Sequence, residues 1–90
     1  MSSDPNLERL REQISEIDRT LIEMFNRRLE VVAQIKRHKD EHGITFVDPE
    51  REAAMFEQRT RENRGPLSNE GLRALYAELL ALTKRELEPG

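Results

Sequence analysis

The chain has 90 residues, of which 36% are hydrophobic and 37% are charged. This length allows one domain, predicted to span residues 1–90, and a hydrophobic share below the usual ~45–50% predicts a thin core for a monomer. The chain has no cysteine and a net charge of −3, from 15 Lys plus Arg against 18 Asp plus Glu. Disulfides and thiol chemistry are therefore excluded, and the charge argues against a nucleic-acid partner.

The first predicted helix is long and extends from residue 7 to residue 42. Its stripe positions recur at alternating intervals of three and four residues, which is the heptad pattern of a helix that packs along another helix. They are Leu7, Leu10, Ile14, Ile17, Leu21, Met24, Arg28, Val31, Ile35 and His38. Asp4 or Asn6 can cap its start, and Gly43 can end it. At ~1.5 Å per residue the helix is ~50 Å long, more than a small monomer can cover, so the stripe predicts a partner chain.

Two shorter helices follow a loop at residues 43–48. Asp48 as N-cap and Pro49 as first residue open a helix that reaches Glu62. The Asn-Arg-Gly-Pro segment at 63–66 breaks it. Ser68 can cap a third helix at 69–87 with a broad, leucine-rich apolar face. Because no strand pattern exceeds four residues, the predicted fold class is all-α, with three helices per chain.

The N-terminal segment 1–6 is polar, and no apolar run approaches the ~20 residues that a membrane span requires. Two histidines alone make a poor metal site. We therefore expect a cytoplasmic protein with no membrane contact and no metal or cofactor.

Several charged side chains lie at positions that are not expected for charges on a solvated helix face. Arg28 takes a stripe position, and Lys39 follows 11 residues later, about three turns on, at ~16 Å of rise. Both point the same way, and their flexible stems can converge on one small anion. Asp48, Arg51 and Glu52 lie near the end of this cationic groove. Taken singly, Arg28 is a register device or the partner of a buried acid, Asp48 is an N-cap, and the other two are surface charges.

Arg11 lies 17 residues before Arg28, or ~25 Å along the helix, so it cannot reach the same ligand within one chain. Two copies packed antiparallel about a twofold axis near residue 22 would solve this, since that position is close to the middle of the helix. Arg11 of one chain would then lie beside Arg28 and Lys39 of the other. Such a homodimer would contain two equivalent anion sites.

Together these residues resemble the all-helical AroQ-class chorismate mutases over residues 7–87. Each fragment alone is weak, but the ordered set with its spacings is fairly specific. The matching stretches are Leu10-Arg11-Glu12-Gln13-Ile14, Ile17-Asp18, Asn26-Arg27-Arg28, Lys36-Arg37-His38-Lys39, Asp48-Pro49-Glu50-Arg51-Glu52, Leu75-Tyr76, Leu79-Leu80 and Thr83.

The resemblance implies an isomerase that works as an intertwined homodimer and rearranges chorismate to prephenate, toward phenylalanine and tyrosine, without a cofactor. It implies that Arg28, and Arg11 from the partner chain, bind the substrate carboxylates. It also implies that Lys39 hydrogen-bonds the ether oxygen and a carboxylate. The reaction is unimolecular, so holding a near-attack conformer helps it. A fixed cation helps further, because negative charge builds on the ether oxygen in the transition state.

The remaining roles also come from the resemblance. Glu52 and the Asp48 region would hold the ring hydroxyl, Arg51 would support the site, and Thr83 matches a position where the family often has Ser, near a carboxylate. The family usually places Gln, sometimes Glu, one turn after the position of Thr83. This chain has Leu87 there, which cannot donate a hydrogen bond.

The departure at Leu87 leaves three possibilities open. A flanking glutamate, Glu86 or Glu88, can donate only when protonated, which predicts higher activity at acid pH. With Leu87 itself in the site, the enzyme is incomplete and slow, and another protein of the shikimate pathway can complete it. The chain can also be a domain cut from a fusion, since Pro89-Gly90 looks like a boundary.

Two other functions fit part of the pattern. An isochorismate pyruvate lyase of the same fold shares the cationic groove, but the acid at Glu52 argues against it, because such lyases tend to be apolar there. A non-catalytic helical dimerisation or regulatory module explains the heptad stripe equally well. It leaves Arg28 and its companion cations unexplained.

Overall fold

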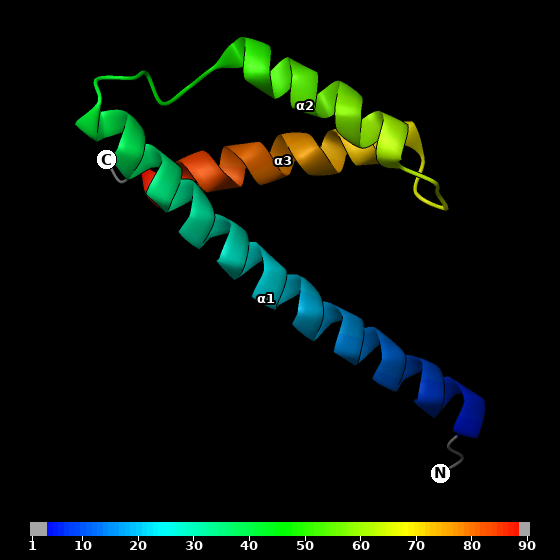
Figure 1. Cartoon of the computed structure of the whole chain (residues 1–90). Helices are drawn as coiled ribbons and strands as arrows, with labels where there is room; N and C mark the ends of the chain where they lie inside the picture. The colour runs from blue at the N-terminus through cyan, green and yellow to red at the C-terminus, as the bar shows by residue number, and fades with distance from the viewer. Residues whose placement is uncertain (1–3, 89–90) are drawn as a thin grey trace. The chain divides into compact units, whose positions relative to one another are not determined.

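The capping residues and the heptad stripe produce three helices in the computed structural model, which describes residues 4–88. They are α1 (Pro5–Glu41), α2 (Pro49–Glu62) and α3 (Asn69–Leu87), as Figure 1 shows. The predicted three-helix, all-α class is confirmed, with every helix end within two residues of its expected place. By its contacts the chain divides into two compact units, which over the described residues are 4–31 and 32–88. The single domain predicted over residues 1–90 stays a prediction.

Local capping sets where α1 begins. Of the two expected caps, Asp4 is the one used, because its Oδ1 accepts from Asn6 N at 2.9 Å and from Leu7 N at 3.4 Å. Pro5 follows as the first helical residue, where a missing N–H costs nothing.

Gly43 ends α1 in the left-handed conformation, with a φ of 66°. Ile44 N donates to Lys39 O at 2.8 Å, and Gly43 N donates to Asp40 O at 3.4 Å. These two bonds are those of a Schellman motif, in which a residue with positive φ folds the chain back over the last helical turn. The loop that follows therefore returns toward the side chains at the end of α1.

The shorter helices begin as predicted. Asp48 Oδ1 accepts from Arg51 N at 3.1 Å and Pro49 is the first residue of α2, while Ser68 Oγ accepts from Gly71 N at 2.9 Å at the start of α3. Between them, Asn63 organises the connection. Its side-chain amide donates to Leu67 O at 2.8 Å, and its carbonyl oxygen accepts from the backbone of Gly65 at 3.1 Å.

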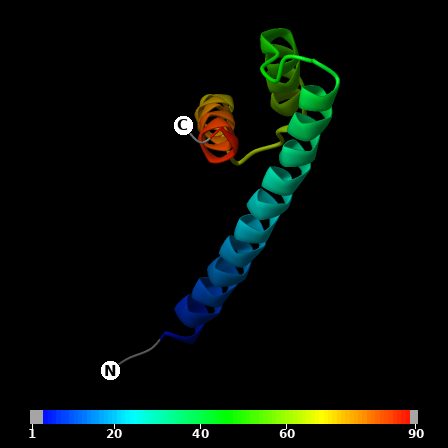
Figure 2. The ribbon, with the colours of Figure 1, turned by 90° about the vertical axis from the view of Figure 1, so that its left-hand side faces the viewer.

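The core of the unit at 32–88 lies between α2 and α3, which run side by side in Figures 1 and 2. Tyr76 is only 7% exposed and meets Phe56 edge-on, with ring centroids 5.0 Å apart. Its hydroxyl contacts Met55 Sδ at 4.0 Å. Next to this cluster, Arg59 pairs with Glu62. The pKa of Arg59 is raised above its usual value, mainly by the carboxylate of Glu62 and to a lesser extent by the hydroxyl of Tyr76. The thin core expected from the composition is confirmed.

The unit at residues 4–31 is a stretch of α1 whose apolar stripe is open. Its stripe side chains are between 44% and 57% exposed, namely Leu7, Leu10, Ile14, Ile17, Leu21, Met24 and Val31. Burying apolar surface contributes ~25 cal/mol per Å², so this stripe is an unused source of stability. Across residues 4–88, each helix is too short or too polar to cross a membrane.

We predict that Gly43→Ala lowers the free energy of unfolding by ~1–2 kcal/mol, because a Cβ is strained at positive φ. The space around Gly43 is open, so any loss reports the backbone and not a clash. Gly43→Asn is the matched control and should cost less, because Asn tolerates this conformation. Urea denaturation at fixed protein concentration measures both, and equal stability of Gly43→Ala and the unaltered chain would contradict the prediction.

Candidate active site

The predicted site residues fall in both units. Arg11 and Arg28 belong to residues 4–31, and the other six, Lys39, Asp48, Arg51, Glu52, Thr83 and Leu87, belong to residues 32–88. Those six come from three elements and their caps: the end of α1, the first turn of α2 and the last turns of α3.

The two arginines of α1 differ in burial. Arg11 is exposed and lies in a shallow depression with Glu8, Glu12 and Ser15. Arg28 is half-buried, although most of the apolar stripe around it is exposed. A guanidinium keeps its charge in any such setting and presents a rigid fork that matches carboxylate oxygens.

Lys39 is half-buried, and the loop after α1 holds its ammonium group. Lys39 Nζ donates to Phe46 O at 3.0 Å and lies 6.0 Å from the centre of the Phe46 ring. Lys36 Nζ lies 5.6 Å from the same ring and pairs with Asp40 at 3.3 Å. Sequence reasoning did not identify Phe46, because this contact depends on how the loop folds back.

The first turn of α2 places three predicted residues. The side chain of Asp48 caps the helix by accepting from Arg51 N, the side chain of Arg51 is exposed, and Glu52 is half-buried. Glu52 Oε1 pairs with Lys84 Nζ of α3 at 3.0 Å. Sequence reasoning missed Lys84, since no local signal indicates a pair between residues on different helices.

The last turns of α3 place Thr83 and Leu87 one turn apart on the same face. Thr83 is 5% exposed, and its Oγ1 donates to Leu79 O at 2.7 Å. Leu87 is half-buried, whereas its neighbours Glu86 and Glu88 are exposed. Side chains four residues apart share a helix face, so Leu87 lies on the same face of α3 as Thr83 and is better aligned with it than Glu86 or Glu88 is.

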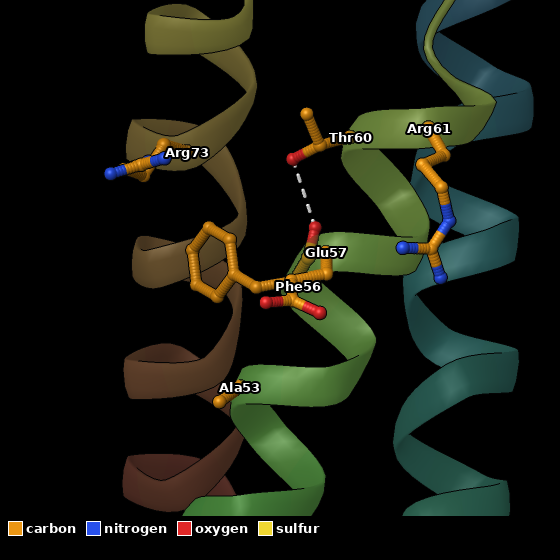
Figure 3. A pocket seen from close by; sticks show the side chains of 6 residues that line it. All are labelled: Ala53, Phe56, Glu57, Thr60, Arg61 and Arg73. Carbon is orange, nitrogen blue, oxygen red and sulfur yellow. Dashed lines mark hydrogen bonds between the residues drawn. The ribbon is translucent and has the colours of Figure 1, made fainter.

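A separate hollow of about 570 Å³ lies along α2 and α3 and contains none of the predicted site residues. Phe56 and Ala53 give it an apolar floor, and Thr60 Oγ1 donates to Phe56 O at 2.9 Å. Figure 3 shows Arg73 on one side of it and Arg61 on the other, with the ring of Phe56 between them. Its cations do not converge, so the hollow does not suit a small anion.

Within residues 4–88, no three His, Cys, Asp or Glu side chains gather as metal ligands would. What the predicted residues offer is fixed charge: cations on α1, and a carboxylate on α2 that is paired with a lysine of α3. Fixed charges of this kind can bind an oppositely charged group and stabilise charge that develops beside them.

Comparison with known proteins gives the family. The sequence pattern of the family described as chorismate mutase type II matches residues 10–88. A solved structure of a chorismate mutase (form II) from Thermus thermophilus superposes with a TM-score of 0.88 at 28% identity, covering 93% of this chain and 96% of that chain.

Two curated relatives are longer proteins. The T-protein of Haemophilus influenzae is 44% identical over 62 residues, which cover 69% of this chain and 16% of the relative. The bifunctional chorismate mutase/prephenate dehydratase of Pseudomonas aeruginosa is 29% identical over 86 residues, covering 90% of this chain and 24% of the relative. This chain therefore spans a minor part of the length of both.

Proposed function

The chain belongs to the chorismate mutase type II family, and we propose on that basis that it catalyses the rearrangement of chorismate to prephenate. One observation carries the proposal: the family pattern extends over residues 10–88 and thus includes every predicted site residue from Arg11 to Leu87. The three-helix fold shared with the Thermus thermophilus mutase supports it.

We propose that the site works by electrostatic preorganisation. Chorismate is a dianion, and Arg28 with Arg11 supplies the guanidinium groups for its two carboxylates. Lys39 donates to the ether oxygen, where negative charge builds as the C–O bond breaks, so its effect is larger in the transition state than in the ground state. No covalent bond to the protein forms in such a reaction.

The proposed roles of the other residues concern the ring hydroxyl and the carboxylates. Glu52, which pairs with Lys84, accepts from the ring hydroxyl together with the Asp48 region, and Arg51 supports them. Thr83, whose hydroxyl donates to Leu79 O in this chain, would turn that O–H toward a carboxylate of the substrate. Each of these roles is assigned because the residue matches a position of the family pattern. The half-burial of Glu52 and the burial of Thr83 support the assignments.

We propose that the working form is a homodimer in which Arg11 comes from the partner chain. The exposed stripe of α1 supports this, because its apolar side chains, such as Ile14 at 57% and Ile17 at 54% exposure, need a partner surface. Contiguous exposed apolar surface of this kind marks an interaction site. We also propose that the protein is cytoplasmic.

The lengths of the relatives suggest one further proposal. This chain matches 16% and 24% of two longer proteins, and the name of one of them joins a chorismate mutase to a second enzyme. We propose that this domain works with another enzyme of the same pathway, either fused to it or bound to it.

The test is the loss of chorismate absorbance with the purified protein. We expect Lys39→Ala to lower kcat ~100-fold or more while KM changes less than ~5-fold, because Lys39 acts mainly on the transition state. Arg28→Ala is the companion variant and should raise KM strongly as well. Comparable losses in kcat and in affinity for Lys39→Ala would contradict its role.

An unaltered chain that folds but leaves chorismate unchanged would count against the mutase. Pyruvate released from isochorismate would then indicate the lyase. Inactivity toward both substrates that persists after addition of cell extract, or of the enzyme that begins the shikimate pathway, would indicate a non-catalytic module.

We predict that Leu87→Gln raises kcat ~10-fold at pH 7.5, because an amide donor would then reach the ether oxygen. Leu87→Met, which is similar in size and lacks a donor, is the control and should leave kcat unchanged. Rates are compared at pH 5 and pH 7.5. An unaltered chain that is much faster at pH 5 would show instead that a protonated Glu86 or Glu88 fills this place.

We predict that mixing Arg11→Ala with Lys39→Ala restores activity. In a heterodimer of the two, one site loses both residues and the other is intact, so random exchange of subunits gives about a quarter of the unaltered activity. The control mixes Arg28→Ala with Lys39→Ala, whose changes lie in the same chain's share of the site, and it should restore none. Failure of the first mixture after proven subunit exchange would refute the crossed site.

A further inference from the structure

The turn at the end of α1 brings the loop onto the side chain of Lys39. The Schellman bond from Ile44 N to Lys39 O, at 2.8 Å, is possible because Gly43 adopts positive φ. Three residues beyond Gly43, Phe46 presents both its carbonyl oxygen, at 3.0 Å from Lys39 Nζ, and its half-buried ring. Lys39 is thus held at two points, by its own backbone carbonyl and by its ammonium group.

The number of hydrogen-bond donors fits the role proposed for Lys39. An ammonium group has three N–H donors and no acceptor. One of them binds Phe46 O, which leaves two. The proposed mechanism asks Lys39 for two contacts, one with the ether oxygen and one with a carboxylate. A bond to a neutral carbonyl also fixes the flexible lysine stem without neutralising its charge, which an acidic partner would do.

The neighbouring lysine does not compete for the same carbonyl. Lys36 Nζ lies beside the Phe46 ring at 5.6 Å, but its partner is the carboxylate of Asp40 at 3.3 Å. Asp40 therefore offsets the charge of Lys36, and the ring face of Phe46 is shared by the two ammonium groups. An aromatic face attracts cations through its quadrupole, so it favours this arrangement.

We propose that Phe46 is a positioning residue that holds the ammonium group of Lys39 ready for the transition state through its backbone carbonyl and ring. This inference rests on the proposed function. It predicts that weakening either contact of Phe46 lowers kcat and leaves substrate affinity nearly unchanged, because Lys39 keeps its charge and loses only its fixed place.

The carbonyl is tested by an ester in place of the amide between Phe46 and Val47, which makes the Phe46 oxygen a weaker acceptor. We expect kcat to fall ~10-fold with KM changed less than ~2-fold. The matched control is the same ester between Ile44 and Thr45, whose carbonyl is not the one that Lys39 contacts, and it should leave kcat within ~2-fold of the unaltered chain.

The ring is tested by 3,4,5-trifluorophenylalanine at position 46, which nearly keeps the shape of Phe but weakens the negative ring face. We expect kcat to fall ~3-fold with unchanged melting temperature. A purely structural ring would tolerate this change, since shape and apolarity are kept. An unchanged kcat in both the ester and the fluorinated chain would overturn the proposal.

A second measurement does not need activity. Proton NMR of the unaltered chain should show the ε-methylene of Lys39 shifted upfield by the ring current of Phe46, and Phe46→Leu should abolish the shift. Resonances of Lys39 at ordinary positions in the unaltered chain would overturn the proposal even if the enzyme is active. Inactivity of the unaltered chain, both alone and with the enzyme that begins the shikimate pathway added, would refute the proposed function and with it the catalytic consequence of the contact. NMR alone would then decide the contact itself.

Discussion

The structure depends on an apolar stripe that the described chain leaves uncovered. Along α1 the apolar stripe side chains from Leu7 to Val31 remain 44% or more exposed, while Tyr76 is the one apolar side chain of residues 4–88 that is buried. So small a core supports the proposed dimer, because small domains with little buried apolar surface are commonly stabilised by association. The same helix carries Arg11 and Arg28, so in the proposed dimer one surface serves both folding and substrate binding.

At the end of α1, the way the helix terminates also determines the surroundings of the Lys39 side chain. Gly43 stops the helix because positive φ costs it little, and the resulting turn satisfies the last carbonyl groups of α1. The same turn brings Phe46 to the ammonium group of Lys39. Helix capping and the placement of a proposed catalytic group are therefore consequences of one backbone conformation.

Features set by neighbouring residues could be predicted from the sequence, and features set by tertiary packing could not. The caps Asp48 and Ser68 and the stop at Gly43 follow from side chains within a few residues. The pair of Glu52 with Lys84 joins residues on different helices and leaves no periodic signal. The contact of Lys39 with Phe46 could not be predicted, because it depends on the path of the loop after α1. Whether Arg11 joins the site depends on a second chain, which neither the pattern nor one protomer contains.

Because position 87 is a leucine, the fixed position of the Lys39 ammonium group is especially important in the proposed site. Where two groups donate to the ether oxygen, a loose lysine is partly compensated by the second donor. With Leu87 at the second position, Lys39 is the one group in the proposed site that stabilises the negative charge that builds on that oxygen. Stabilising a transition state by a fixed charge depends on that charge being in place beforehand, because moving it during the reaction costs free energy. A site with one donor therefore gains more from a carbonyl 3.0 Å from that donor than a site with two.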